Sequence, residues 1–223
     1  MQKIKDIIKE RVLVLDGPMG TMVQGYGLKE TDFRGSEFKD HPMDLVGNND
    51  ILSITRPDII SEIHESYLQA GADLIETNTF NANSISQADY QMEHMVYDLN
   101  LQSAKIAKDI SDRFTKSNPN KPRFVCGAIG PTNQTASMSP DVSDPGHRNV
   151  DFDQLVDAYK EQVCGLVDGG VDILMIETVF DTLNCKAALF AIQSFFKELG
   201  QEIPVIVSGT ITDASGRLLS GQT

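Results

Sequence analysis

Short apolar runs without polar alternation recur along the chain, and each is followed by a polar or glycine-containing turn and then a helical pattern. Continuous apolar runs of this length are typical of strands that are buried on both faces of a parallel sheet. The sequence therefore predicts five parallel strands, at Val12–Leu15, Asp73–Thr77, Phe124–Ile129, Asp172–Glu177 and Pro204–Ser208.

Amphipathic helices are predicted between these strands. In Pro57–Ala70 the apolar side chains fall on one stripe, and Asp151–Asp168 repeats the pattern behind an aspartate that suits an N-cap. Met92–Phe114 and Asn184–Leu199 also have helical patterns, and Gly200 is placed to end the second of them. The predicted order of elements is β, α, β, α throughout.

Two stretches resemble each other, AGADLIET at residues 70–77 and GGVDILMIET at residues 169–178. Each leads from a glycine-containing helix end through an aspartate and an apolar strand to Glu-Thr, which indicates one repeated βα unit and favours a β/α barrel. An open doubly wound sheet is the alternative. The long crossover from Asp16 to Asp73 and the absence of a GxGxxG turn argue against it.

The predicted fold class is α/β, an incomplete (β/α)8 TIM-type barrel, with residues 1–223 forming the N-terminal part of one barrel domain. A full barrel of eight units takes roughly 250 residues, whereas the chain up to Ser208 contains about five predicted units. We therefore expect the chain to lack the C-terminal strands and to leave an open parallel edge.

Composition excludes several classes of function. The formal net charge of −13 repels a phosphate backbone, so nucleic acid is not an expected partner. No apolar run approaches the roughly 18 residues that a membrane span needs, and the N-terminal run is too short for a signal peptide, so a cytoplasmic protein without membrane contact is expected. The spacing of the three cysteines fits neither a disulfide framework nor a CxxC zinc site.

Polar residues follow every predicted strand, where β/α barrels carry their chemistry. Asp16, Glu76 or Glu177 could hold an ammonium group while glycine amides approach a carboxylate, which suits a small zwitterion such as an amino acid. Taken singly, each acid more often caps a helix or satisfies a loop amide, and it is the recurrence of acids at successive strand ends that favours a binding site. The histidines show no metal-ligand spacing, and surface or loop positions are expected for His41, His64, His94 and His147.

Several segments closely resemble the homocysteine S-methyltransferase family, and within it the N-terminal homocysteine-binding module of cobalamin-dependent methionine synthase. The resemblance runs from about Arg11 to the last residue. The segments that carry it are VLVLDGPMGTMVQ, GNNDILSITRPDII, AGADLIETNTFNANSI, ADYQMEHM, GPTNQTASMSPDVSDP, IETVFDTLNCKAALFA and SGTITDASGRLLSGQT. Betaine- or S-methylmethionine-using relatives, and a non-catalytic fragment, are the alternatives.

The resemblance implies a site for homocysteine at the barrel mouth. The positions that match family contacts are Asp16, Gly17, Thr77 and Glu177, with Asn78 and Ser208 as weaker candidates. Pro18 departs from the small residue usual in the family, and it removes a backbone N–H that a ligand carboxylate could use.

The resemblance also implies cofactors and partners of a longer parent protein. In the family, zinc held by three cysteines activates the homocysteine thiol, and methylcobalamin supplies the methyl group. The implied partners are folate-, cobalamin- and reactivation-type modules of the same parent chain. The family's cysteine ligands are expected beyond Thr223, and none of Cys126, Cys164 and Cys185 matches them. This chain is therefore expected to carry no catalytic residue, to bind neither zinc nor methylcobalamin on its own, and to be inactive as given.

Overall fold

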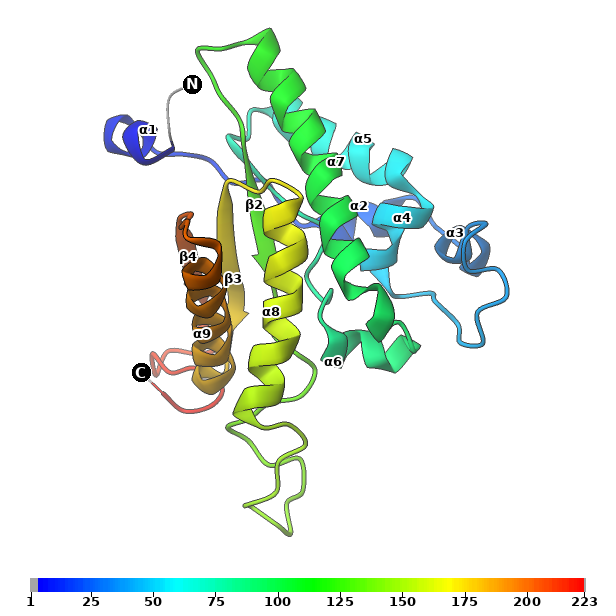
Figure 1. Cartoon of the computed structure of the whole chain (residues 1–223), viewed down its shortest axis with the longest axis vertical. Coiled ribbons are helices and arrows are strands. Elements are labelled where there is room, and N and C mark those ends of the chain that lie inside the picture. The colour runs from blue at the N-terminus through cyan, green and yellow to red at the C-terminus, as the bar shows by residue number, and fades with distance from the viewer. Residues whose placement is uncertain (1–3, 223) are drawn as a thin grey trace.

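The protein is described by a computed structural model over residues 4–222. Its centre is a parallel sheet whose four strands follow one another in chain order (Figure 1). The strands are β1 (Leu74–Glu76), β2 (Phe124–Ile129), β3 (Ile173–Val179) and β4 (Val205–Gly209). Because a helical crossover joins each strand to the next, the predicted α/β fold of partial β/α-barrel type is confirmed.

The predicted first strand, Val12–Leu15, is not part of this sheet as a regular strand. It meets β1 only through a bridge between Leu15 and Leu74, supported by hydrogen bonds from Asp73 N and Leu74 N to Val14 O at 2.7 and 3.1 Å. Val12 is 84% exposed. The segment runs beside β1 but has little packing on its other sides, so its apolar run does not produce the buried strand that the pattern predicts.

Four long helices cover one face of the sheet, and each of them packs against the next long helix along the chain (Figure 1). They are α5 (Pro57–Ala70), α7 (Val96–Ser117), α8 (Phe152–Asp168) and α9 (Thr182–Leu199). Their apolar stripes form the main core with the outward side chains of the strands. α7 begins four residues later than predicted, because Glu93–Met95 forms a separate 3-10 turn, η3.

Local capping explains where two of these helices begin and end. The Asp151 carboxylate accepts a hydrogen bond from Gln154 N, and the Gln154 side chain accepts one from Asp151 N, both at 2.9 Å. Asp181 caps α9 by accepting hydrogen bonds from the amides of Leu183 and Asn184. Gly200 ends α9 in the left-handed region at φ 71°.

The long crossover before β1 contains a small core of its own. Side chains such as Val23, Phe33, Leu45 and Ile60 are buried together there. The crossover contains α2 (Met19–Gly25), α3 (Glu30–Arg34), η1 (Asn49–Ile51), α4 (Leu52–Thr55) and α5, while α6 (Ser84–Gln87) and η2 (Ala88–Tyr90) follow β1. The helical segments of this crossover explain its length without requiring a different fold.

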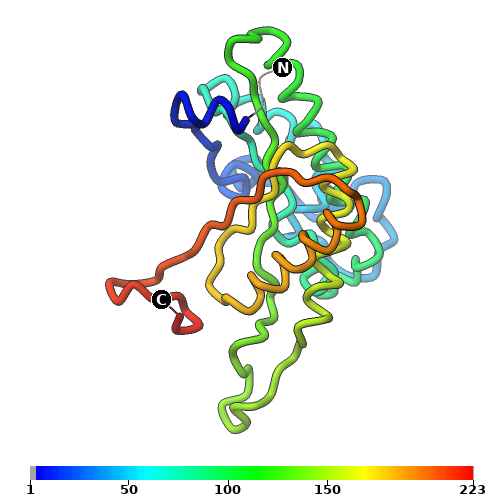
Figure 2. Tube along the Cα trace, turned by 60° about the vertical axis from the view of Figure 1, so that its left-hand side comes forward, coloured from blue at the N-terminus to red at the C-terminus, as the bar shows by residue number. Residues whose placement is uncertain are grey.

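Within residues 4–222, the opposite face of the sheet is covered at one end and carries a groove at the other. Helix α1 (Ile4–Glu10) places Ile7 against a small cluster that includes Leu74, Phe124 and Met175. β4 forms the edge of the described sheet and is largely exposed, contrary to the prediction that every strand is buried on both faces. Figure 2 shows the chain after β4 running away from the helical layer. Within residues 4–222, no helix is both long and apolar enough to cross a membrane.

His64 lies on α5 and is fully buried at 0% exposure, so its predicted surface position is wrong. Neither ring nitrogen has a hydrogen-bond partner among the described residues. Burial lowers the pKa of His64 to about 4 because the charged imidazolium is poorly solvated inside the protein. A single sequence cannot distinguish this histidine from an exposed one, since it falls beside the apolar stripe of its helix.

Replacing His64 by Leu should reduce the loss of stability in mild acid. The unfolded chain takes up a proton near pH 6.5 and the folded protein only near a pKa of about 4, so His64 contributes to stability above pH 6.5 and this contribution is lost as the pH falls. Between pH 7 and pH 5 the lost stability amounts to about 2 kcal/mol. Urea unfolding of wild type and His64→Leu at both pH values measures it.

The exposed His147 offers the matched control for that experiment. His147→Leu should keep the wild-type difference in unfolding free energy between the two pH values. If His64→Leu shows the same difference as wild type, His64 is not buried as a neutral imidazole.

Candidate functional site

A cavity of about 290 Å³ opens at the carboxyl ends of the strands, between the turn after Leu15, η1 and the segment after β1. Of the predicted site residues, the structure brings five together here and leaves Ser208 out. The cavity is lined by Asp16, Gly17, Pro18, Met19, Gly20, Asn49, Asp50, Glu76, Thr77, Asn78, Thr79, Phe80, Asn81 and Glu177.

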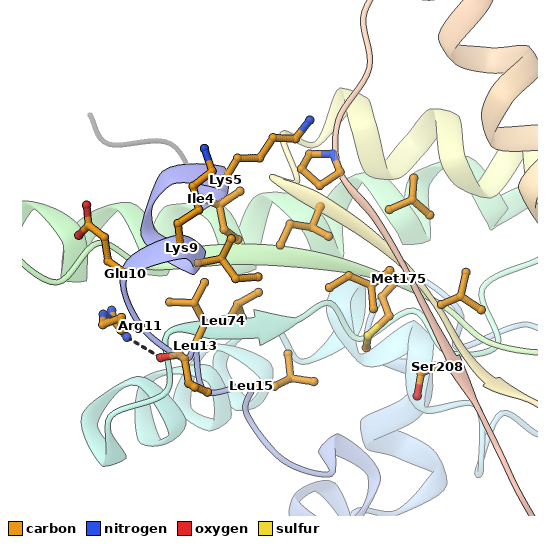
Figure 3. A pocket seen from close by; sticks show the side chains of 17 residues that line it. Ile4, Lys5, Lys9, Glu10, Arg11, Leu13, Leu15, Leu74, Met175 and Ser208 are labelled. Atoms are coloured by element: carbon orange, nitrogen blue, oxygen red, sulfur yellow. Dashed lines mark hydrogen bonds between the residues drawn. The ribbon is translucent and has the colours of Figure 1, made fainter.

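Ser208 lies instead beside a larger groove of about 910 Å³ between α1 and β4, which we call the apolar groove. Figure 3 shows Ser208 at its edge and the side chains of Leu13, Leu74 and Met175 along it. The cavity with the acids extends from the segment before β1 only as far as β3. Ser208 therefore lies one strand beyond the cavity, although it too stands near the carboxyl end of its strand.

Asp16 and Glu76 are held next to each other by the backbone. Asp16 N donates to Leu74 O, and Asp16 Oδ2 accepts from Glu76 N, both at 3.0 Å. Asp16 Oδ1 and Glu76 Oε1 are buried, and neither has a hydrogen-bond partner among the described residues. Two carboxylate oxygens thus remain free of protein donors at this end of the sheet.

The pKa values of the cavity carboxyls are raised. Burial is the main cause for Asp16, Glu76 and Glu177, and it brings the pKa of Asp16 to about 7 and that of Glu76 to about 8. The nearby charge of Glu177 adds to both shifts, and the pKa of Glu177 is itself raised by burial. Like charges in a poorly solvated space disfavour ionisation, so this arrangement suits a cationic ligand group.

The end of β3 is irregular where it supplies Glu177. Thr178 has φ 55°, a left-handed conformation that a β-branched residue rarely adopts, and the pairing with β4 is shifted between Ile176 and Val179. Between these two pairs β3 has one residue more than β4. This bulge lets Glu177 line the cavity while Val179 packs into the core on the helical face. A side-chain hydrogen bond from Thr178 lowers the pKa of Glu177 and partly offsets its burial.

Thr77 and Asn78 use their side chains mainly to hold the cavity wall. Thr77 Oγ1 accepts from Ala128 N at 2.9 Å and lies 2.6 Å from Thr79 Oγ1. Asn78 Nδ2 donates to Asn49 O at 2.7 Å and to Ser53 Oγ at 3.2 Å. These contacts join the end of β1 to β2 and to the crossover, and they fix the shape of the cavity.

Gly17 and Pro18 also line the cavity, in the turn after Leu15. A Cβ on Gly17 would lie 3.0 Å from the Tyr67 ring, so the glycine permits this close packing. Tyr67 donates a hydrogen bond to Pro18 O at 3.3 Å, and Pro18 stands at the N-cap of α2. The proline ring is compatible with the start of a helix, where its missing N–H has no intrahelical partner.

Asp50 lines the same cavity and was not among the predicted site residues. It is 3% exposed, accepts a hydrogen bond from Asn81 N at 3.1 Å, and has its pKa raised by burial to about 7. Asp50 lies within the crossover rather than at a strand end, so the strand-end rule could not find it. The only available signal was its place in the resembling segment GNNDILSITRPDII.

Residues 13–223 match the family described as homocysteine S-methyltransferase. The chain belongs to this family. Membership agrees with the parallel α/β fold and with an acid-lined cavity at the carboxyl ends of its strands.

Solved structures of a homocysteine methyltransferase share the fold. The metallated form of MmuM from Escherichia coli has a TM-score of 0.73 at 20% identity, with 98% of this chain and 70% of that chain covered. Its oxidized form gives 0.72 at 19% identity, with 99% and 70% covered. The apo form gives 0.65 at 20% identity, with 99% and 66% covered.

The described part of this homocysteine S-methyltransferase chain offers no set of zinc ligands. No group of three or more His, Cys, Asp or Glu side chains between residues 4 and 222 is arranged to hold a metal ion. Cys126 is buried in β2, while Cys164 and Cys185 lie on α8 and α9. Burial and the charges of Glu76, Asp16 and Glu177 raise the pKa of Cys126 well above its ordinary value, which disfavours the thiolate that a metal would need.

Proposed function

We propose that the cavity binds L-homocysteine for S-methylation, with its ammonium group between the carboxylates of Asp16 and Glu177. The observation that carries the proposal is the set of acids facing a cavity of about 290 Å³ in a chain of this family. None of the described residues that line it is Lys, Arg or His, so a cation there meets attraction and no competing positive side chain.

The residues of this chain bind and orient the amino-acid end of the substrate. The carboxylate of homocysteine is assigned to the side of the cavity formed by Gly17 and Thr77, with Asn78 supporting that wall. Methyl transfer breaks the bond between the methyl group and its donor and forms a bond between the methyl group and the homocysteine sulfur, which loses its proton. Holding the substrate in one orientation lowers the entropic cost of this step.

The proposal extends to a parent protein of the cobalamin-dependent methionine synthase type in the cytoplasm, with folate-, cobalamin- and reactivation-type modules as partners. Support comes from residues 130–145 and 210–223, whose strings resemble that subgroup. In the first of these, Ser137 donates from its N and Oγ to the Asp181 carboxylate at 3.1 and 2.6 Å, so the loop is tied to the start of α9. We assign zinc and methylcobalamin to that parent protein.

Titration calorimetry of the whole chain with L-homocysteine tests the proposal. One site per chain is expected. L-Homoserine, which carries oxygen in place of sulfur and keeps both charged groups, should bind the same site because the residues assigned here contact only the amino-acid end. An absence of heat and of any change in melting temperature with millimolar L-homocysteine would show that the cavity is not its binding site.

A further inference from the structure

Glu76 supplies a further carboxylate to the cavity, and the family resemblance assigns it no ligand contact. Its Oε1 atom is buried without a hydrogen-bond partner among the described residues, as is Asp16 Oδ1. A buried polar atom left without a partner is destabilising. Two such atoms among the residues that line one cavity indicate that a ligand group supplies the missing partner.

The titratable side chains that the structure places around Glu76 come from several elements, and they are acids and a thiol. Asp16 precedes β1, Glu177 ends the regular part of β3, and Cys126 is the direct partner of Glu76 in β2. Asp50 on η1 lines the same cavity. Burial first, and then the charges of Glu177 and Asp16, raise the pKa of Glu76 to about 8, so near neutral pH its carboxyl is mostly protonated in the empty cavity.

We infer that the empty cavity stores a proton on Glu76, and that the ammonium group of an entering amino acid expels this proton to solvent. The inference rests on the proposed function, which assigns L-homocysteine to the cavity. An O–H bond of the neutral carboxyl breaks, the proton passes to the buffer, and the positive charge of the ammonium group takes its place. No redox or covalent step on the ligand is involved.

This exchange makes Glu76 a specificity residue for cationic ligands. A ligand without an ammonium group leaves the proton in place and gains no partner for Glu76 Oε1. An amino acid gains a third carboxylate once the proton has left. Its binding therefore strengthens as the pH rises towards the pKa of about 8, until the ammonium group itself loses its proton.

Calorimetry of the whole chain with L-homocysteine at pH 7, in phosphate and in Tris, counts the protons released because the two buffers differ in ionisation enthalpy. About one proton per ligand is expected. The dissociation constant should fall by more than about tenfold between pH 6 and pH 7, because Asp16, with a pKa of about 7, also loses its proton in this range. In Glu76→Gln the proton count should drop by about half or more, and the pH dependence should flatten to about fivefold, the part that comes from Asp16.

The exposed Glu202 provides the matched control, since it lies outside the cavity. Glu202→Gln should keep both the wild-type proton count and the pH dependence. Thermal melting of each variant confirms that it is folded. With wild type, 4-mercaptobutanoate, which lacks the amino group, should bind at least tenfold more weakly and release no proton; this arm does not depend on how Glu76→Gln folds.

The outcomes separate the two proposals. Binding of L-homocysteine without proton release, or an unchanged proton count in folded Glu76→Gln, overturns the proton exchange and leaves the proposed function intact. Proton release with 4-mercaptobutanoate also overturns it. A wild-type chain that binds no L-homocysteine at any pH overturns the proposed function and, with it, the exchange.

Discussion

Asp16→Asn and Glu177→Gln should each weaken the binding of L-homocysteine about 100-fold or more, because removing one partner of a buried charge pair costs roughly 3–5 kcal/mol. Both side chains line the cavity, and both are the proposed partners of the substrate ammonium group. The variants preserve side-chain size, so the loss reports the charge. Calorimetry at pH 8, above the Asp16 pKa of about 7, gives the affinities with Asp16 largely ionised.

The exposed Asp40 supplies the matched control. Asp40→Asn should bind L-homocysteine as wild type does. Thermal stability of Asp16→Asn should not fall below that of wild type, because an amide avoids the cost of ionising a buried carboxyl and its oxygen can still accept from Glu76 N. Binding within threefold of wild type in both cavity variants would refute their assignment.

Gly130→Ala should lower the free energy of unfolding by about 3 kcal/mol, since overpacking in a close-packed site typically costs 1–3 kcal/mol and occasionally more. Gly130 follows β2, and a Cβ there would lie 2.3 Å from Phe80 O and 3.0 Å from the Phe80 ring. A backbone oxygen cannot rotate away as a side chain can. The segment after β1 must shift, and since Phe80 lines the cavity, homocysteine binding should weaken as well.

Gly209→Ala is the control for this prediction, since Gly209 also stands at a strand end and a Cβ there meets no atom within 4 Å. Its free energy of unfolding should stay within about 0.5 kcal/mol of wild type. Urea denaturation measures both variants. Equal stability of Gly130→Ala and Gly209→Ala would mean that the contact with Phe80 is absent.

The sequence predicts best where burial and regular structure coincide. β2 is observed at Phe124–Ile129 and α5 at Pro57–Ala70, the predicted bounds in both cases. Both elements lie in the core, where every local choice of residue agrees with the packing. The same reasoning explains why Asp16 and Glu177, which follow apolar runs, were expected at one edge of the sheet and are found there.

Differences between prediction and structure arise from the packing of one element against another, which the hydrophobic periodicity of a single segment does not reveal. Val12–Leu15 has the composition of a buried strand but lies beside β1 with little packing on its other sides. His64 is fully buried on α5, which packs against other helices and β1, and Asp50 reaches the cavity because the crossover folds back over the strand ends. Ser208 lines the apolar groove rather than the cavity, since a strand-end position does not say how far a cavity extends across the sheet.

A crystal structure of the whole chain with L-homocysteine at pH 8 tests the central claim most directly. The account predicts the amino nitrogen within about 3 Å of carboxylate oxygens of Asp16 and Glu177, inside the cavity at the carboxyl ends of the strands. A ligand bound in the apolar groove between α1 and β4, or one that turns its carboxylate towards these acids, would contradict it.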